Sequence, residues 1–248
     1  MSTIYILWLR QLKRYFRSKA RMIGSLGQPI LFLVALGFGF GPIYNKAGGG
    51  DYIQFLAPGV ISMSILFTAI FSGIEIIWDK QFGFLKETLV APVSRFTIML
   101  GRTLGGATVA TIQGLIVLVL SFLVGFRPEN LILLPVAIII MFMIALLFTA
   151  LGTAIASMLD DMQGFQLIMN FLVMPIFFLS GSLFPLKGLP SAINIIAKID
   201  PLSYGVDALR GMFLGDYHFG LTIDLIALLS GILVFMLLGS YLFRKIEA

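Results

Sequence analysis

Six long blocks of apolar residues constrain the fold of this chain more than any other feature. Each block is long enough to cross a hydrocarbon core of ~30 Å as a helix that rises ~1.5 Å per residue. Within the blocks, Phe, Leu, Ile, Val, Gly and Met follow one another without the alternation of a membrane β-strand. The sequence therefore predicts an all-α membrane protein whose six transmembrane helices cover residues 22–41, 55–77, 103–124, 131–157, 165–185 and 221–243.

The composition fits this class and argues against several kinds of active site. Of the 248 residues, 59% are hydrophobic and 12% are charged, which is unusual for a soluble domain. There is no cysteine and one histidine, His218, so we expect no disulfide and no metal site built from Cys or His. Intramembrane proteolysis needs a serine with a histidine, or two facing aspartates, at membrane depth, and the predicted helices offer neither. We expect no catalytic residue, no metal and no cofactor bound by this chain.

The positions of Lys and Arg predict the orientation in the membrane. The net charge is +5, but the basic residues sit at the ends of apolar blocks, which favours membrane orientation over nucleic-acid binding. Six basic residues and no acidic residue lie in residues 10–21, which predicts a cytoplasmic N-terminus, and six spans return the C-terminus to the same side. In this topology 12 of the 17 basic residues are cytoplasmic. One loop, with Asp160 and Asp161, has no basic residue, but acidic residues carry little weight in this rule.

Two cytoplasmic segments are more than plain loops. Residues 1–21 place apolar and aromatic side chains at helical spacing between basic ones, which predicts an amphipathic helix in the membrane interface. Residues 78–95, between spans two and three, mix charges with Phe82, Phe84 and Leu85, which predicts a short helix on the cytoplasmic surface that ends before Pro92. This helix can dock on a partner; a folded loop that packs on its own spans is the alternative.

The external segment 186–220 is long and far from polar. Pro190 and Pro201 divide it into two apolar stretches, 192–199 and 202–214, which are too short to span a membrane. We therefore expect two short re-entrant helices that dip into the outer leaflet, because an ordinary loop would expose these apolar residues to water.

These motifs together resemble the permeases of ABC-2 type transporters. The resemblance is carried by Phe178-Leu-Ser-Gly-Ser-Leu-Phe-Pro185, Leu189-Pro190 and Asp200-Pro-Leu-Ser-Tyr-Gly-Val-Asp-Ala-Leu-Arg210 in the external segment, and by Asp79-Lys-Gln-Phe-Gly-Phe-Leu-Lys-Glu87 and Pro92-Val-Ser-Arg95 in the cytoplasmic one. Gln28-Pro-Ile-Leu-Phe32 and Phe55-Leu-Ala-Pro-Gly59 are similar to the branch that includes daunorubicin-type drug-resistance permeases. The matches follow the expected order along nearly the whole chain.

The resemblance implies a half-transporter that pairs with a second copy of itself, as a homodimer, and with two copies of a separate ABC ATPase subunit. It implies that ATP and Mg²⁺ are bound by that ATPase, and the chain itself has no Gly-x-x-x-x-Gly-Lys-Ser/Thr phosphate loop. It assigns an ATPase-coupling interface to Asp79, Phe82, Gly83, Phe84, Leu85, Glu87 and Pro92. It assigns a structural role in the external re-entrant motif to Pro185, Pro201, Tyr204 and Arg210.

Two charged residues stand near the cytoplasmic ends of predicted spans. Glu75 and Arg102 are costly there unless they are paired or reach the headgroups, so they either pair with each other, contact a partner or reach the interface. The remaining span residues carry almost no charge, which disfavours an ion or a small hydrophilic substrate. Together with this, the resemblance implies export of a hydrophobic or amphipathic substrate across the prokaryotic cytoplasmic membrane. A secondary transporter or channel without an ATPase is the alternative, although it generally needs ionisable groups or an internal repeat near the midplane. Drugs, lipids, glycolipids and polysaccharides all remain open as substrates.

Overall fold

The computed structural model describes residues 2–85, 88, 92–188 and 190–244, apart from the side chain of Arg21, and every regular element in these ranges is helical. Glu87 and Leu189, named above, lie outside the described residues. The first half contains α1 (Thr3–Arg17), α2 (Lys19–Leu31), the π-helix η1 (Phe32–Leu36), α3 (Gly37–Lys46), α4 (Tyr52–Phe71), α5 (Ile74–Gln81) and α7 (Arg95–Val124). The second half contains the 3₁₀ turn η2 (Leu131–Leu133), α8 (Leu134–Met158), α9 (Met162–Leu179), α10 (Ser191–Ile199), α11 (Pro201–Leu214) and α12 (Leu221–Arg244).

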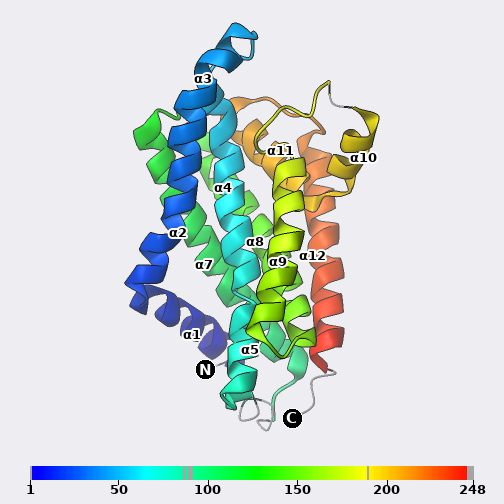
Figure 1. Ribbon diagram of the computed structural model, residues 1–248. Helices are drawn as coiled ribbons and strands as arrows, with labels where there is room; N and C mark the ends of the chain where they lie inside the picture. The colour runs from blue at the N-terminus through cyan, green and yellow to red at the C-terminus, as the bar shows by residue number, and fades with distance from the viewer. Residues whose placement is uncertain (1, 86–87, 89–91, 189, 245–248) are drawn as a thin grey trace.

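Six helical stretches of the described chain are long and apolar enough to cross a membrane, and each contains one predicted block or most of it. They are Met22–Lys46, Tyr52–Gln81, Arg95–Val124, Leu131–Met158, Met162–Leu179 and Leu221–Arg244. Figure 1 shows them as one bundle, with the N-terminus and the last turn of α12 at one end and α10 and α11 at the other. The chain is therefore a multi-pass membrane protein.

Two predicted boundaries are the furthest from the observed ones. The fifth span ends at Leu179 instead of Pro185, because Ser180 begins a turn and Gly181 adopts a left-handed backbone with φ +76°. The third span begins at Arg95 instead of Thr103, since Ser94 caps the helix by accepting from the Thr97 N–H. Arg102 therefore lies two turns inside α7.

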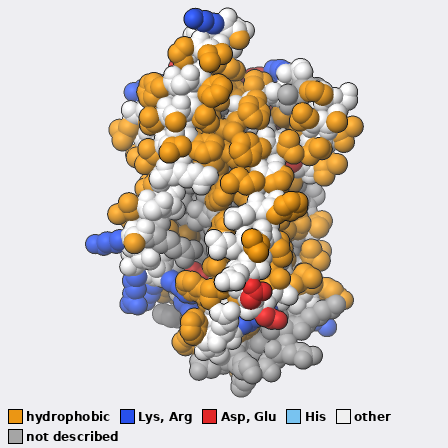
Figure 2. Space-filling view, viewed as in Figure 1, with side chains coloured by type: hydrophobic (Ala, Val, Ile, Leu, Met, Phe, Trp, Pro, Cys, Tyr) orange, Lys and Arg blue, Asp and Glu red, His pale blue; other side chains and the backbone are white. Residues whose placement is uncertain are grey.

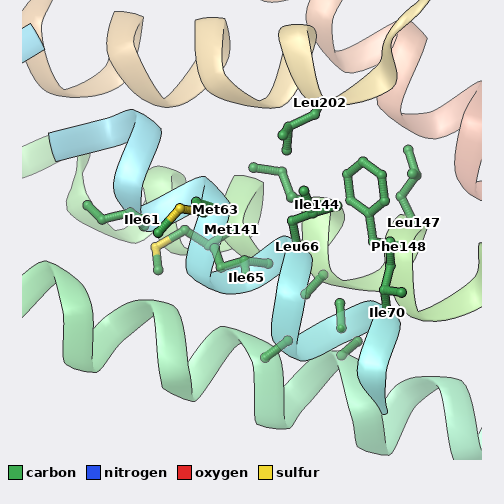
Figure 3. Packing of buried hydrophobic residues seen from close by; sticks show 14 of the residues in the cluster. Ile61, Met63, Ile65, Leu66, Ile70, Met141, Ile144, Leu147, Phe148 and Leu202 are labelled. Carbon is green, nitrogen blue, oxygen red and sulfur yellow. The ribbon is translucent and has the colours of Figure 1, made fainter. Parts of the chain in front are cut away.

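Helix α4 forms the centre of the bundle and packs against α7, α8 and α11. Figure 3 shows Leu66 of α4, Ile144 of α8 and Leu202 of α11 pointing toward one another in the buried layer. Close backbone approach tightens this packing, because a Cβ on Gly152 would lie 2.4 Å from the Ile70 carbonyl oxygen. In lipid such contacts, more than burial from water, hold helices together.

The outer helices leave apolar faces uncovered. On α9, Leu167 and Phe171 are exposed, and on α12 a row of leucines, among them Leu233 and Leu237, is exposed as well. Figure 2 shows hydrophobic side chains over most of the visible face, while Lys and Arg gather at the lower left, over α1 and the start of α2. This distribution is that of a protein surrounded by lipid or by further membrane helices.

Helix α1 lies across the end of the bundle, at a steep angle to the spans (Figure 1). It packs along α7, where glycines allow a close approach: a Cβ on Gly101 would lie 3.0 Å from the Cβ of Leu7. Trp8 Nε1 donates to Thr108 Oγ1 at 3.0 Å, and the Tyr15 hydroxyl donates to Gln113 Oε1. The helix predicted in residues 1–21 thus exists over Thr3–Arg17, and its position in the membrane interface stays a prediction.

Candidate functional site

A buried charge cluster ties α1, α5 and α7 together at the end of the bundle where the N-terminus lies. The Asp79 carboxylate accepts from Arg102 Nη2 at 2.6 Å and from Arg10 Nη2 at 2.9 Å, so one acid holds two arginines. Asp79 and Arg102 are almost fully buried. Removing one member of such a buried pair costs ~3–5 kcal/mol, because the other charge is left uncompensated.

Glu75 completes the cluster one turn earlier in α5. Its carboxylate lies 3.6 Å from Arg14 Nη1, and the Arg14 guanidinium lies over the Trp78 ring at 4.8 Å. The structure therefore places Glu75, which pairs with Arg14, one helical turn from the Asp79–Arg102 pair. The sequence analysis did not identify Arg10 and Arg14 as partners of these acids. The signal that could have indicated them is that α1 carries several basic residues and no acidic residue to pair with them.

Two aromatic side chains project just beyond this cluster. Phe82 is 70% exposed and Phe84 52% exposed, although the Arg10 guanidinium lies 5.9 Å from the Phe84 ring centroid. Gly83 between them has φ +79°, a left-handed conformation that favours glycine and ends the straight course of α5. Of the other predicted coupling residues, Leu85 is buried, Pro92 is exposed and Glu87 lies outside the described residues.

Lys80 joins α5 to the turn between α8 and α9. Its ammonium donates to the carbonyl oxygens of Ser157 and Leu159, each at 3.0 Å, and lies 3.2 Å from the Asp160 carboxylate. A cation at the C-terminal end of α8 also matches the partial negative charge of the helix end. Lys80 supplies the basic group that the Asp160 loop lacks in its own sequence. Sequence reasoning missed this contact because it joins residues some 80 positions apart.

At the opposite end of the bundle, Arg210 of α11 binds backbone. Its Nη2 donates to the Gly181 carbonyl oxygen at 3.0 Å and to that of Phe55 at 3.4 Å, and its guanidinium lies 3.9 Å from the Phe55 ring centroid. Burial lowers the pKa of Arg210 to about 10, so the side chain remains charged at neutral pH. Arg210 thereby joins α11 to α4 and to the turn that follows α9.

The residues that neighbour Arg210 in the sequence motif shape helix ends. Pro201 is the first residue of α11, and Asp200 before it caps the helix by accepting from the Leu202 N–H at 2.9 Å. The Tyr204 hydroxyl donates to the Lys198 carbonyl oxygen at 2.6 Å, which fastens α11 to the end of α10. Pro185 lines a small hollow beside Arg210. None of these contacts has the form of a catalytic site.

A metal centre finds no support in the described residues, which hold no group of three or more His, Cys, Asp or Glu side chains that could bind an ion. The candidate functional features are instead two groups of residues, one at each end of the bundle. One is the charge cluster with its exposed aromatics, and the other is the motif around Arg210 at the opposite end of the bundle.

Comparison with known proteins places these structures in a family. The family model described as "ABC-2 type transporter" matches residues 2–214. Nodulation protein J of Rhizobium leguminosarum bv. trifolii is 28% identical over 213 residues, which covers 85% of this chain and 78% of that protein. A protein named as a transport permease, ycf38, from Cyanophora paradoxa is 26% identical over 260 residues and covers 98% of this chain and 88% of that protein. Another ycf38, from Pyropia yezoensis, is 30% identical over 85% of this chain and 73% of that protein. The chain belongs to the ABC-2 type transporter family, and it is the membrane subunit of a transporter.

Proposed function

We propose that this chain is the permease of an ATP-driven exporter that moves hydrophobic or amphipathic molecules out of the cytoplasm or the inner leaflet. A separate ABC ATPase, which binds ATP and Mg²⁺, supplies the energy. Two copies of this chain form the pathway as a homodimer, and two ATPases bind at the end that carries the charge cluster, which is the cytoplasmic end. Membership of the ABC-2 family supports the ATPase partner, and the run of Lys and Arg on α1 supports the orientation.

The observation that carries this proposal is that two exposed aromatic side chains follow directly after a residue held by buried ion pairs. Phe82 and Phe84 are exposed, whereas Asp79 one turn earlier is fixed by Arg10 and Arg102. Aromatic side chains on a rigid support are typical centres of protein interfaces. We assign the docking contact to Phe82 and Phe84, and we assign the anchoring of the segment to Asp79.

Force on the docked segment reaches the spans along two connections. The first runs through Asp79 into α1 and α7, and the second runs through Lys80 into the α8–α9 turn. ATP binding draws the two ATPases together, and the segment moves with them. Because α5, α7 and α8 are packed and ion-paired, they follow as a unit and change the gap between the two permease copies.

The proposed substrate class follows from the few charges in the spans. Glu75, Asp79 and Arg102 are neutralised within the cluster, and Asp224 lies at the first turn of α12, so the central part of the described spans offers no free charge to an ion. This favours hydrophobic and amphipathic molecules. Drug transport, suggested by the resemblance of Gln28–Phe32 and Phe55–Gly59, is one member of this class.

The proposal predicts that charged replacements of the two aromatics uncouple the transporter. In the double variant Phe82→Asp/Phe84→Asp, ATP-dependent efflux of a lipophilic dye from inverted vesicles should fall at least ~10-fold, because a carboxylate must be desolvated at the interface. The matched control, Phe82→Leu/Phe84→Leu, keeps the apolar contact and should retain most of the efflux. Both variants should reach the membrane in equal amounts. Unchanged efflux in the Asp variant would remove this segment from the coupling interface.

A further inference from the structure

A hollow of about 890 Å³ lies between α1 and α5, beside the charge cluster. Four basic side chains of α1 line it, namely Arg10, Lys13, Arg14 and Arg17. Each has a neighbour three or four residues away, so the four share one face of the helix. Another face of α1 packs on α7, which leaves the basic face to the hollow. Binding sites for small molecules have volumes of this order.

The hollow carries more positive charge than its own acids balance. The two arginines that belong to the charge cluster, Arg10 and Arg14, already have acid partners. Lys13 and Arg17 are exposed and form no ion pair within the described part of the chain. Asp79 is the one acid among the described lining residues, and its carboxylate already accepts from two arginines. Two cations therefore remain for a ligand, and the charge of the hollow favours an anion.

Apolar side chains lie beside these cations. Ile6 and Leu9 of α1 line the hollow, and Ile6 is 53% exposed. Tyr5 and Trp78 add aromatic surface to the same lining. An inorganic anion would cover the charged part and leave the apolar part uncovered. The lining therefore fits an amphiphile whose anionic group faces the two unpaired cations.

The position of the hollow along the chain favours a lipid over a soluble acidic partner. The first membrane span begins at Met22, five positions after Arg17, which corresponds to ~8 Å of helix. The headgroup layer of a bilayer extends roughly 5–8 Å beyond the hydrocarbon core, so Arg17 reaches the level of the lipid phosphates. Basic clusters directly beside a membrane span typically bind anionic lipids.

We propose that this hollow binds an anionic phospholipid that stays with the permease and is not its exported substrate. Lys13 and Arg17 bind the phosphate, and the apolar wall with Ile6 contacts an acyl chain. A zwitterionic lipid is disfavoured, because its ammonium group would meet the same cations. Phe82 and Phe84, which also line the hollow, keep the ATPase contact proposed above. Lipid binding here is independent of the proposed export function.

The test measures lipid binding to the full-length chain without any ATPase. The delipidated protein in a neutral detergent is titrated with dioleoyl phosphatidylglycerol and with dioleoyl phosphatidylcholine, and native mass spectrometry counts the bound lipids. Phosphatidylglycerol should bind at least ~10-fold more tightly than phosphatidylcholine. Lys13→Gln/Arg17→Gln should weaken phosphatidylglycerol binding at least ~10-fold, because two charged contacts to the phosphate are lost. Glycerol phosphate, the soluble head without chains, should not displace the lipid even in large excess.

Two matched variants separate this site from a general attraction between charges. Lys19→Gln/Arg244→Gln removes two exposed charges at the same end of the bundle and outside the described lining, and it should bind phosphatidylglycerol like the wild type. Lys13→Arg/Arg17→Lys keeps both charges and should retain binding. An equal loss in Lys19→Gln/Arg244→Gln, equal affinity for the two lipids, or displacement by glycerol phosphate would each overturn the assignment.

An acidic surface of the ATPase is the competing occupant of the hollow. If Lys13→Gln/Arg17→Gln binds phosphatidylglycerol undiminished but loses a co-purified ATPase, the hollow is a protein-docking surface and the lipid assignment is wrong. Because neither ATPase nor exported substrate takes part in the lipid titration, its failure leaves the proposed export function standing.

Discussion

At the residue scale, Asp79 is the most constrained acid of the buried charge cluster. It is buried and accepts from two arginines on two different helices, Arg10 of α1 and Arg102 of α7. Asp160 makes an ion pair too, but its side chain is 92% exposed. Exposed pairs contribute ~0–1 kcal/mol, whereas breaking a buried pair costs several times more.

Asp79→Asn should therefore destabilise the protein strongly. The substitution leaves Arg102 buried without a charged partner, and we expect the free energy of unfolding to fall by ~3–5 kcal/mol. The matched change Asp160→Asn should cost no more than ~1 kcal/mol. Denaturant unfolding in detergent, followed by Trp fluorescence, measures both. Equal stability of the two variants would show that the cluster does not hold α1 in place.

Asp200 gives a second expectation at this scale, because burial raises its pKa to about 8 from an ordinary value of 3.8. Between pH ~4 and pH ~8, the folded state therefore holds a proton that the unfolded state has lost. The contribution of this group to the free energy of unfolding is fully present below pH ~4 and decreases as the pH rises toward 8. Asn at this position can still cap α11 but carries no charge. Asp200→Asn should thus raise the melting temperature at pH 8 and leave it nearly unchanged at pH 4, as thermal unfolding at both pH values can check. A variant that is less stable at pH 8 would contradict this.

At the scale of elements, the sequence predicted most helices but few of their contacts. Pro190 and Pro201 mark the starts of α10 and α11, which match the predicted ranges 192–199 and 202–214 to within one residue. Their entry into the outer leaflet stays a prediction. The end of α9 was missed because Phe184 and its neighbours continue the apolar pattern beyond the turn at Ser180. The contacts of Arg10 and Lys80 join distant parts of the chain, and no local pattern contains them.

The packing of α1 against α7 can be tested at Gly101, where the two helices come close together. A Cβ on Gly101 would lie 3.2 Å from the backbone of Ile4, so Gly101→Val should push α1 away from α7. Because the chain has no cysteine, Leu7→Cys can report the change, and its labelling by a maleimide should speed up at least ~10-fold. The control Gly27→Val meets open space and should leave the labelling slow. Slow labelling in both variants would mean that α1 does not depend on this contact.

At the scale of the whole molecule, the bundle separates two kinds of surface. One end carries the basic helix α1 and the exposed Phe82 and Phe84, and the other end carries α10 and α11, of which Arg210 binds α11 to the turn after α9. The six spans between them present apolar faces (Figure 2). This polarity is what a permease requires if an ATPase acts at one end and the substrate leaves at the other.

The central claim is that a separate ATPase drives this permease from the end that carries Phe82 and Phe84. The most direct test is to purify the tagged chain from its native membrane in mild detergent, identify what remains bound, and measure ATP hydrolysis. We predict a stoichiometric subunit with a phosphate loop and ATPase activity, retained by Phe82→Leu/Phe84→Leu and lost from Phe82→Asp/Phe84→Asp. A homo-oligomer free of any ATPase, under conditions that preserve other membrane complexes, would contradict the claim and favour a secondary transporter or channel.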